Sequence, residues 1–327
     1  LGSGLALAGT GETSWIEDVV SALDSFVWGP IMILLLLGTH VFMTFRTGFI
    51  QRKIPLGIKL SVTKDEGVGD VSPFAALTTS LAATIGTGNI IGVATALIAG
   101  GPGALFWMWM TGVFGIATKY SETLIALKYR VKAHNGNMLG GAMYALQRGF
   151  KKEKLGKVLA VLFALFAAIA SFGIGAAVQA NSLSGAVVSV AGDAALATST
   201  ISVFGLFETT PLQIIVGLLV VVFVAVVILG GIKVISRVCE KLIPFMTIFY
   251  VLGCLILICI NAQYFIDAIG LIVVCAFTPQ AAFGGAVGTS IMLALQFGCA
   301  RGLFSNESGL GSSPLLASAA ITRNPHA

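Results

Sequence analysis

The sequence has few charged residues. Lysine, arginine, aspartate and glutamate make up 10% of its 327 residues, whereas about 25% is usual for a soluble domain. Apolar residues make up 57%, and the mean hydropathy is +0.97. The apolar runs are too long for membrane barrel strands and lack their alternating pattern. We therefore expect an all-α, polytopic helical membrane protein.

The residue types that build most active sites and metal sites are also scarce. The three histidines stand apart, and the five cysteines lack the spacing of a metal site or a disulfide framework. No glycine loop ends in Gly-Lys-Ser or Gly-Lys-Thr, so no ATPase domain is predicted. The net charge of +5 does not indicate nucleic-acid binding, because the basic residues lie at helix ends and in short loops. We expect a chain that is not an enzyme, with no organic cofactor and no evident obligate protein partner.

Apolar runs of roughly 20 residues predict seven membrane spans. The stretch that follows Tyr264 and ends at Phe277 is shorter, and we interpret it as a surface or re-entrant helix. Residues 50–60 and 141–150 have the pattern of short amphipathic helices at the membrane surface. The seven predicted spans are 28–45, 74–99, 103–128, 157–180, 211–232, 242–261 and 286–304.

Basic residues are absent from every second loop. All of the 19 lysines and arginines except Lys119 lie in the alternate loops or at the span ends that bound them. Because cytoplasmic loops carry the excess of lysine and arginine, the N-terminus is predicted outside a cell membrane and the C-terminus of this chain inside. The loops without basic residues are 1–27, 100–102, 181–210 and 262–285.

The second predicted span is interrupted by polar and flexible residues. Its centre reads Thr-Ile-Gly-Thr-Gly-Asn at positions 84–89. Unwound backbone in a membrane is tolerated where it lines a cavity, and transporters bind substrates and ions at such breaks. The alternative is a close helix contact made through small residues.

The chemistry of such a break indicates which ligands it can bind. Free N–H groups at the start of a half-helix attract a carboxylate, while free carbonyls and the Asn89 amide oxygen suit a small hard cation such as Na⁺. Glycines leave room for a small side chain only. Together these features predict a small zwitterion with a coupled cation. We see no carboxylate at the breaks, which favours Na⁺ over a proton.

A second segment, 284–311, has a similar composition. The sequence around Gln296 and Gly298 predicts another break, in a span that runs in the opposite direction, as in inverted-repeat transporters. An unbroken glycine-rich helix followed by an ordinary loop is the alternative.

Charged and amide side chains lie in other predicted spans. Lys119 and Glu122 have the i, i+3 spacing of a helical ion pair, and we interpret them as structural. Gln179 lies two turns after Phe172 on one helix face and suits either an interhelical bond or a site. Arg301 and Glu307 are gating candidates, with an interfacial position as the alternative.

Long motifs of this chain resemble the alanine or glycine:cation symporter family. They are Gly69–Glu122 and Ala300–Ser312, with shorter matches at 24–30 and 45–49. The resemblance implies a LeuT-type inverted-repeat fold in one transmembrane domain. Its parts would be an extracellular segment (1–27), an extra helix (28–45), a five-helix repeat (74–261), the first helix of a second repeat (286–304) and a cytoplasmic segment (305–327).

The resemblance also implies a function. It is Na⁺-coupled import of alanine or glycine across the cell membrane by alternating access. A proton-coupled symporter and a channel or uniporter for a small solute are the alternatives. Members of this family continue for about four more spans, so we expect this chain to be a fragment that does not transport by itself.

The same resemblance implies the binding residues. Asn89, the Ala83 carbonyl and the Thr289 hydroxyl would bind Na⁺. The residues that would bind the substrate are Thr84, Gly86, Thr87, Gly88, Phe172, Gln179, Ser290, Gln296 and Gly298.

Overall fold

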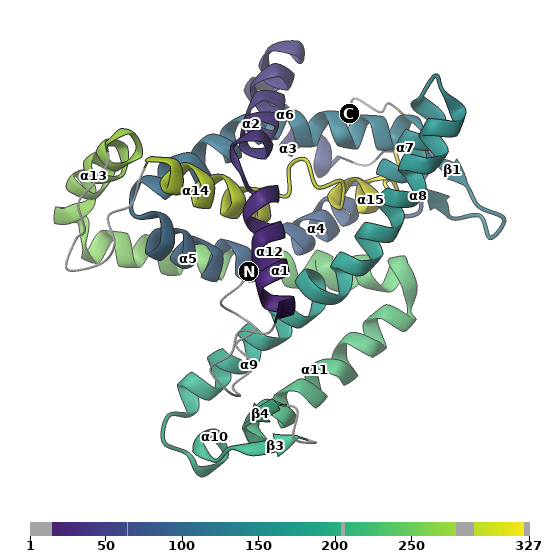
Figure 1. The fold of residues 1–327 in the computed structure, drawn as a ribbon. Helices are drawn as coiled ribbons and strands as arrows, with labels where there is room; N and C mark the ends of the chain where they lie inside the picture. Colours follow the sequence, from purple (N-terminus) through teal and green to yellow (C-terminus); the bar gives the residue numbers. More distant parts are fainter. Residues whose placement is uncertain (1–14, 64, 204–206, 279–290, 324–327) are drawn as a thin grey trace. The chain divides into compact units, whose positions relative to one another are not determined.

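The computed structural model describes residues 15–63, 65–203, 207–278 and 291–323 (Figure 1). The chain divides into two compact units. One is formed by Leu1–Met32 and Ile169–Gly230, and the other by Ile33–Ala168 and Gly231–Ala327. The predicted break in the second span lies in the second unit.

The first unit contains a helical pair and a short hairpin. Helices α9 and α11 contact each other, and strands β3 and β4 pair antiparallel with Ile201 opposite Thr209. A π-helical turn, η3, leads into α9, and such turns are frequent at functional sites. Its elements are α1 (Trp15–Val27), η3 (Ser171–Ala177), α9 (Val178–Ala191), α10 (Ala195–Thr198), β3 (Ile201–Val203), β4 (Phe207–Thr209) and α11 (Pro211–Leu229).

The second unit is built around α6. Helix α14 packs along α6 and also contacts α5, while α4 packs on α12 and α15 (Figure 1). Its elements up to the β-hairpin are α2 (Pro30–Arg46), η1 (Ile50–Lys53), α3 (Ile54–Ser61), α4 (Pro73–Thr84), η2 (Thr87–Asn89), α5 (Ile91–Gly100), α6 (Gly103–Lys128), β1 (Val131–Lys132) and β2 (Met138–Leu139).

The remaining elements of this unit follow the hairpin. Two amphipathic helices were expected near 50–60 and 141–150, and both segments are helical, as η1 with α3 and as α7. The stretch expected as a surface or re-entrant helix is α13, which contacts α6. The elements are α7 (Ala142–Gly149), α8 (Glu153–Ala170), α12 (Gly231–Ile260), η4 (Ala262–Tyr264), α13 (Phe265–Phe277), α14 (Ile291–Asn306) and α15 (Ser313–Ala317).

Several helices have the length and hydropathy of membrane spans. Within the described ranges, four continuous helical segments qualify, and the bent pair α4–α5 makes a fifth. Helices α6 and α14 do not qualify by this measure, so the count of seven spans stays a prediction. The four segments are Asp18–Arg46, Glu153–Ala191, Pro211–Leu229 and Gly231–Ile260.

Two predicted spans lie within longer helices, so their limits as membrane spans stay predictions. The span predicted to begin at residue 242 is part of α12, which begins at Gly231. The span predicted over 157–180 continues helically to Ala191. In both cases the helix extends beyond its most apolar part, because backbone hydrogen bonding does not stop where the hydropathy falls.

The end of the described chain is attached to the segment before α4. Asp70 N–H donates to Ala319 O (2.7 Å), and Ile321 N–H donates to Val71 O (2.8 Å). The Arg130 guanidinium donates to three carbonyls of these two segments. A Cβ at Gly69 would collide with the Ala320 backbone. The predicted cytoplasmic segment is therefore packed against the helical unit as far as residue 323.

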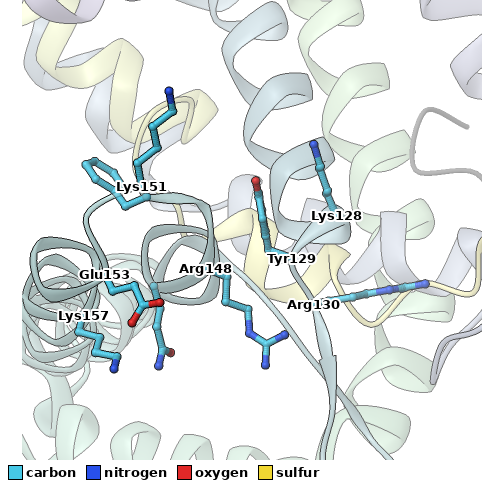
Figure 2. Close-up of a pocket in the computed structure, with 9 residues that line it drawn as sticks. Lys128, Tyr129, Arg130, Arg148, Lys151, Glu153 and Lys157 are labelled. Atoms are coloured by element: carbon cyan, nitrogen blue, oxygen red, sulfur yellow. The ribbon is translucent and has the colours of Figure 1, made fainter.

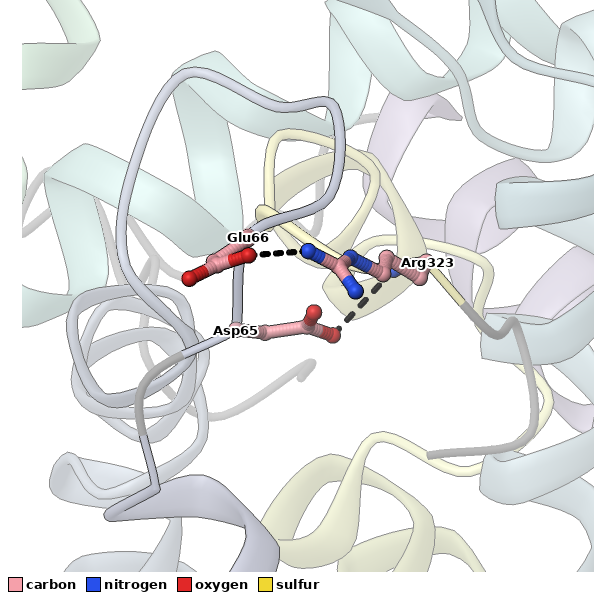
Figure 3. Close-up of polar contacts among 3 residues, drawn as sticks. All are labelled: Asp65, Glu66 and Arg323. Atoms are coloured by element: carbon pink, nitrogen blue, oxygen red, sulfur yellow. Dashed lines mark hydrogen bonds and ion pairs between the residues drawn. The ribbon is translucent and has the colours of Figure 1, made fainter.

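Two acidic residues hold the last described residue, Arg323 (Figure 3). Its guanidinium pairs with Glu66, and its N–H donates to Asp65 Oδ2 at 3.1 Å. This donated N–H lowers the pKa of the exposed Asp65 carboxyl below its ordinary value.

Candidate functional site

The second predicted span is broken where the sequence predicted. Helix α4 ends at Thr84, η2 and α5 follow, and the two halves are bent by 59°. Gly86 is extended, with φ and ψ both at −157°. After Ile85 N–H donates to Leu81 O, the next backbone bonds are three-residue turns, from Asn89 N–H to Gly86 O and from Ile90 N–H to Thr87 O. The regular helical ladder is thus interrupted at Gly86.

The C-terminal end of α14 lies against this break. Ser305 Oγ donates to Asn89 Oδ1 at 2.6 Å, and Asn89 Nδ2 donates back to the Thr84 carbonyl at 3.3 Å. A Cβ at Gly88 would lie 3.2 Å from the Phe304 carbonyl oxygen. Gly88 therefore lets the two backbones approach closely, and Asn89 connects the two sides of the break to α14.

Lys119 joins the break to α14 from a third element, α6. Its Nζ donates to Thr84 Oγ1 at 3.0 Å and to the Asn306 carbonyl at 2.9 Å. The predicted ion pair between Lys119 and Glu122 is wrong: in the described residues, no ion pair other than Arg323–Glu66 is present. Glu122 instead accepts from Gly309 N–H at 3.2 Å. The helical spacing that allowed the pair is overridden by tertiary partners.

A carboxylate also lies at the break. Glu307 Oε2 is 3.5 Å from Thr84 Oγ1, and Glu307 has the left-handed backbone conformation, with φ of 53°. This conformation costs a non-glycine residue about 1–2 kcal/mol, and such residues concentrate at functional sites. The sequence-based statement that the breaks contain no carboxylate is therefore wrong. Glu307 lies 223 residues after Thr84 in the sequence, and the turn that follows α14 places its carboxylate beside Thr84.

The second predicted break is absent. Helix α14 continues from Ile291 to Asn306 through Gln296 and Gly298. A Cβ at Gly298 would collide with the Ala104 carbonyl and lie 2.7 Å from Trp107 Cβ, and a Cβ at Gly302 would collide with Thr111. Glycines at these positions let α14 approach α6, which is the alternative role of small residues in membrane helices. The chain leaves the helix later, at Glu307.

The other predicted site residues are only partly brought together. Phe172 and Gln179 belong to the first unit, so their closing of the pocket stays a prediction. Thr289 and Ser290 lie outside the described residues. Arg301 lies in α14 and forms no ion pair with Glu307 or any other described residue.

The site contains both charge signs and several oxygen atoms. A fixed ammonium group, a carboxylate, an amide and two hydroxyls converge on a broken helix. Hydroxyl, amide, carbonyl and carboxylate oxygens are the ligands that hard cations prefer, and the Lys119 ammonium group already binds two of these oxygens, Thr84 Oγ1 and the Asn306 carbonyl. Ser305 and Asn306 are visible in the sequence only as the start of a polar run, because their role depends on the position of the end of α14.

Comparisons with known proteins relate this chain to transporters. The chain is 48% identical over 312 residues to the sodium/alanine symporter AgcS of Methanococcus maripaludis, which covers 94% of this chain and 64% of that protein. It is 49% identical over 313 residues to an uncharacterized transporter of Haemophilus influenzae, with 95% and 64% covered. It is 33% identical over 314 residues to the probable sodium/glutamine symporter GlnT of Bacillus subtilis, with 95% and 60% covered.

The chain thus spans less than two thirds of the length of these relatives. A model of the sodium:alanine symporter family matches residues 13–327. Because this match covers nearly the whole chain, the protein belongs to the sodium:alanine symporter family, whose members are membrane transporters and not enzymes.

Proposed function

We propose that the intact protein is a Na⁺-coupled symporter that imports a small neutral amino acid, alanine or glycine, across the cell membrane. The observation that carries the proposal is the broken helix at Gly86, which meets the end of α14 through Asn89 and Ser305. Transporters place substrate and ion sites at such discontinuous helices. The similarity to a named sodium/alanine symporter supports the substrate and ion.

The substrate carboxylate is proposed to bind at Gly86 and Thr87, before the second half-helix. The Lys119 ammonium group supports an anionic ligand there, because it already lies 3.0 Å from Thr84 Oγ1 on the same break. The close approach of Gly88 to the Phe304 carbonyl supports a small substrate.

The coupling ion is proposed to be Na⁺, held by Asn89 with the Ala83 carbonyl and Thr289. Cation and substrate would then stabilise the same geometry of the break, so each would raise the affinity for the other. The nearness of Glu307 to Thr84 favours a second candidate, proton coupling, because a carboxylate at the break can carry a proton.

Uptake of labelled alanine into proteoliposomes tests the proposal. The intact protein should accumulate alanine when Na⁺ is high outside, and glycine should compete; K⁺ in place of Na⁺ should abolish uptake. Uptake that is driven by a pH gradient in the absence of Na⁺ would show that the coupling ion is the proton. Non-saturable flux along either gradient would favour a channel. If the folded protein shows no flux, alanine and glycine are not its substrates.

The variant Glu307→Gln distinguishes Na⁺ coupling from proton coupling more directly. It keeps the size of the side chain and removes the titratable group. A Na⁺-coupled protein should retain Na⁺-driven uptake in this variant, although at a changed rate, whereas proton-driven uptake should be lost. Glu208→Gln, in β4 of the other unit, is the matched control.

A further inference from the structure

A basic pocket lies apart from the broken helix, where the end of α6 meets α7 and the start of α8 (Figure 2). Its volume is about 500 Å³. In Figure 2, Arg148 lies between Tyr129 on one side and Glu153 and Lys157 on the other. The lining residues are Lys128, Tyr129, Arg130, Gln147, Arg148, Phe150, Lys151, Glu153 and Lys157.

The positive charge of this pocket is largely uncompensated. Five of its lining residues are basic, and Glu153 is the single acidic one. Arg130 already donates to three backbone carbonyls. Arg148, Lys151 and Lys157 have no ion pair with the described part of the chain. Three flexible cationic side chains thus remain available to an anion.

The position of the pocket indicates where that anion comes from. Lys128 ends the apolar helix α6, and Lys157 lies in the first turns of α8, the start of a membrane-spanning helical segment. The amphipathic helix α7 lies between them in sequence. The distribution of basic residues predicts that this face is cytoplasmic. This prediction places the cations at the depth of phospholipid headgroups, beside a helical segment that is long and apolar enough to cross the bilayer.

An apolar surface continues from the pocket along α8. Val158, Val161 and Leu165 are 56%, 67% and 52% exposed, and their spacing places them on one side of the helix. A molecule with a phosphate headgroup in the pocket could lay its acyl chains on this surface. A soluble phosphate compound would leave the surface unused.

We propose that this pocket binds the headgroup of an anionic phospholipid of the cytoplasmic leaflet, with Arg148, Lys151 and Lys157 around its phosphate. Guanidinium groups pair with phosphate oxygens through two parallel hydrogen bonds, and lysines add point charges. Basic pockets beside membrane helices on the cytoplasmic side bind such headgroups. The site is independent of the amino-acid site.

The test measures thermal unfolding of the intact protein in a neutral detergent. Dioleoylphosphatidylglycerol should raise the midpoint in a saturable manner, and dioleoylphosphatidylcholine should not. The double variant Arg148→Gln/Lys157→Gln should bind phosphatidylglycerol roughly 25-fold more weakly, at about fivefold for each charge removed. The control Lys152→Gln/Lys154→Gln removes the same charge from neighbouring exposed residues that do not line the pocket.

Three results would overturn the proposal. An equal loss in both double variants would show a general surface charge effect. An equal shift with inorganic phosphate at the same concentration would show a site for soluble phosphate. Equal shifts with both lipids would show that the headgroup charge is irrelevant. The unfolding midpoint without added lipid verifies that each variant is folded.

Discussion

The Lys119 ammonium group lies 3.0 Å from Thr84 Oγ1, at the point where α4 ends. The same Nζ donates to the Asn306 carbonyl at the end of α14. One cation therefore satisfies polar groups at the ends of two helices that are more than 200 residues apart in sequence. Since α6 carries this lysine as part of a continuous helix, it holds the two ends in a fixed relation.

Lys119→Met should impair transport while keeping the bulk of the side chain. Hydrogen bonds to charged groups contribute about 1.5–3 kcal/mol each, so we expect Na⁺-driven alanine uptake to fall by at least about tenfold. The measurement is initial uptake rate in proteoliposomes at equal protein content. Lys59→Met, at an exposed position of α3, is the control. Unchanged uptake in Lys119→Met would remove this residue from the mechanism.

The bond between Asn89 and Ser305 predicts energetic coupling. Asn89→Ala should raise the Na⁺ concentration needed for half-maximal uptake and should change the preference between alanine and glycine little. Ser305→Ala should have a smaller effect in the same direction, because it removes the partner that orients the amide oxygen. The double variant should resemble Asn89→Ala alone, with a coupling energy of about 0.5–1.5 kcal/mol.

Strict additivity of the two substitutions would contradict that coupling. The matched control is Asn89→Ala with Ser182→Ala, because the Ser182 hydroxyl bonds only within its own helix. These two changes should add.

The local features of the site could be predicted from sequence. The run from Thr84 to Asn89 contains two glycines within an apolar span, and α4 ends there as expected. Local backbone preference and hydropathy are sufficient for that prediction. The family assignment from the motifs around this run was also confirmed by the family match.

The tertiary partners could not be predicted in the same way. Lys119 was assigned to Glu122 because helical spacing is the only relation visible in a sequence, yet its partners come from α4 and α14. Gly298 was assigned to a break because a glycine signals either flexibility or close packing, and only the neighbouring Ala104 and Trp107 decide between them. Glu307 reaches the site through a left-handed turn that charge patterns do not reveal.

Gly298→Ala should destabilise the fold more than it changes selectivity. The added methyl group would collide with the Ala104 backbone on α6, and overpacking of this kind costs about 1–3 kcal/mol. The unfolding midpoint in detergent should fall. Gly253→Ala is the control, since no described atom beyond the adjoining turns of α12 lies within 4 Å of its Cβ position, and it should be neutral or slightly stabilising. An unchanged unfolding midpoint together with an altered substrate preference would instead support the predicted substrate-binding role of Gly298.

The contact between Asp65 and Arg323 should depend on pH. The donated Arg323 N–H lowers the folded-state pKa of Asp65 below its ordinary value of 3.8. A carboxyl with a lowered pKa stabilises the folded state above its unfolded pKa, and the contribution is lost as the pH falls through the folded value. Hydrogen exchange of the Arg323 amide, corrected for intrinsic rates, should therefore show protection at pH 7 that disappears below the usual range of aspartate.

Asp65→Ala should remove that protection at pH 7, while Asp193→Ala, in the other unit, should leave it unchanged. Because Glu66 still pairs with the Arg323 side chain, the segment should stay attached in the Asp65 variant, and only the amide should exchange faster. Protection that persists at pH 7 without Asp65 would mean that the backbone bonds of Ala319 and Ile321 hold the segment unaided.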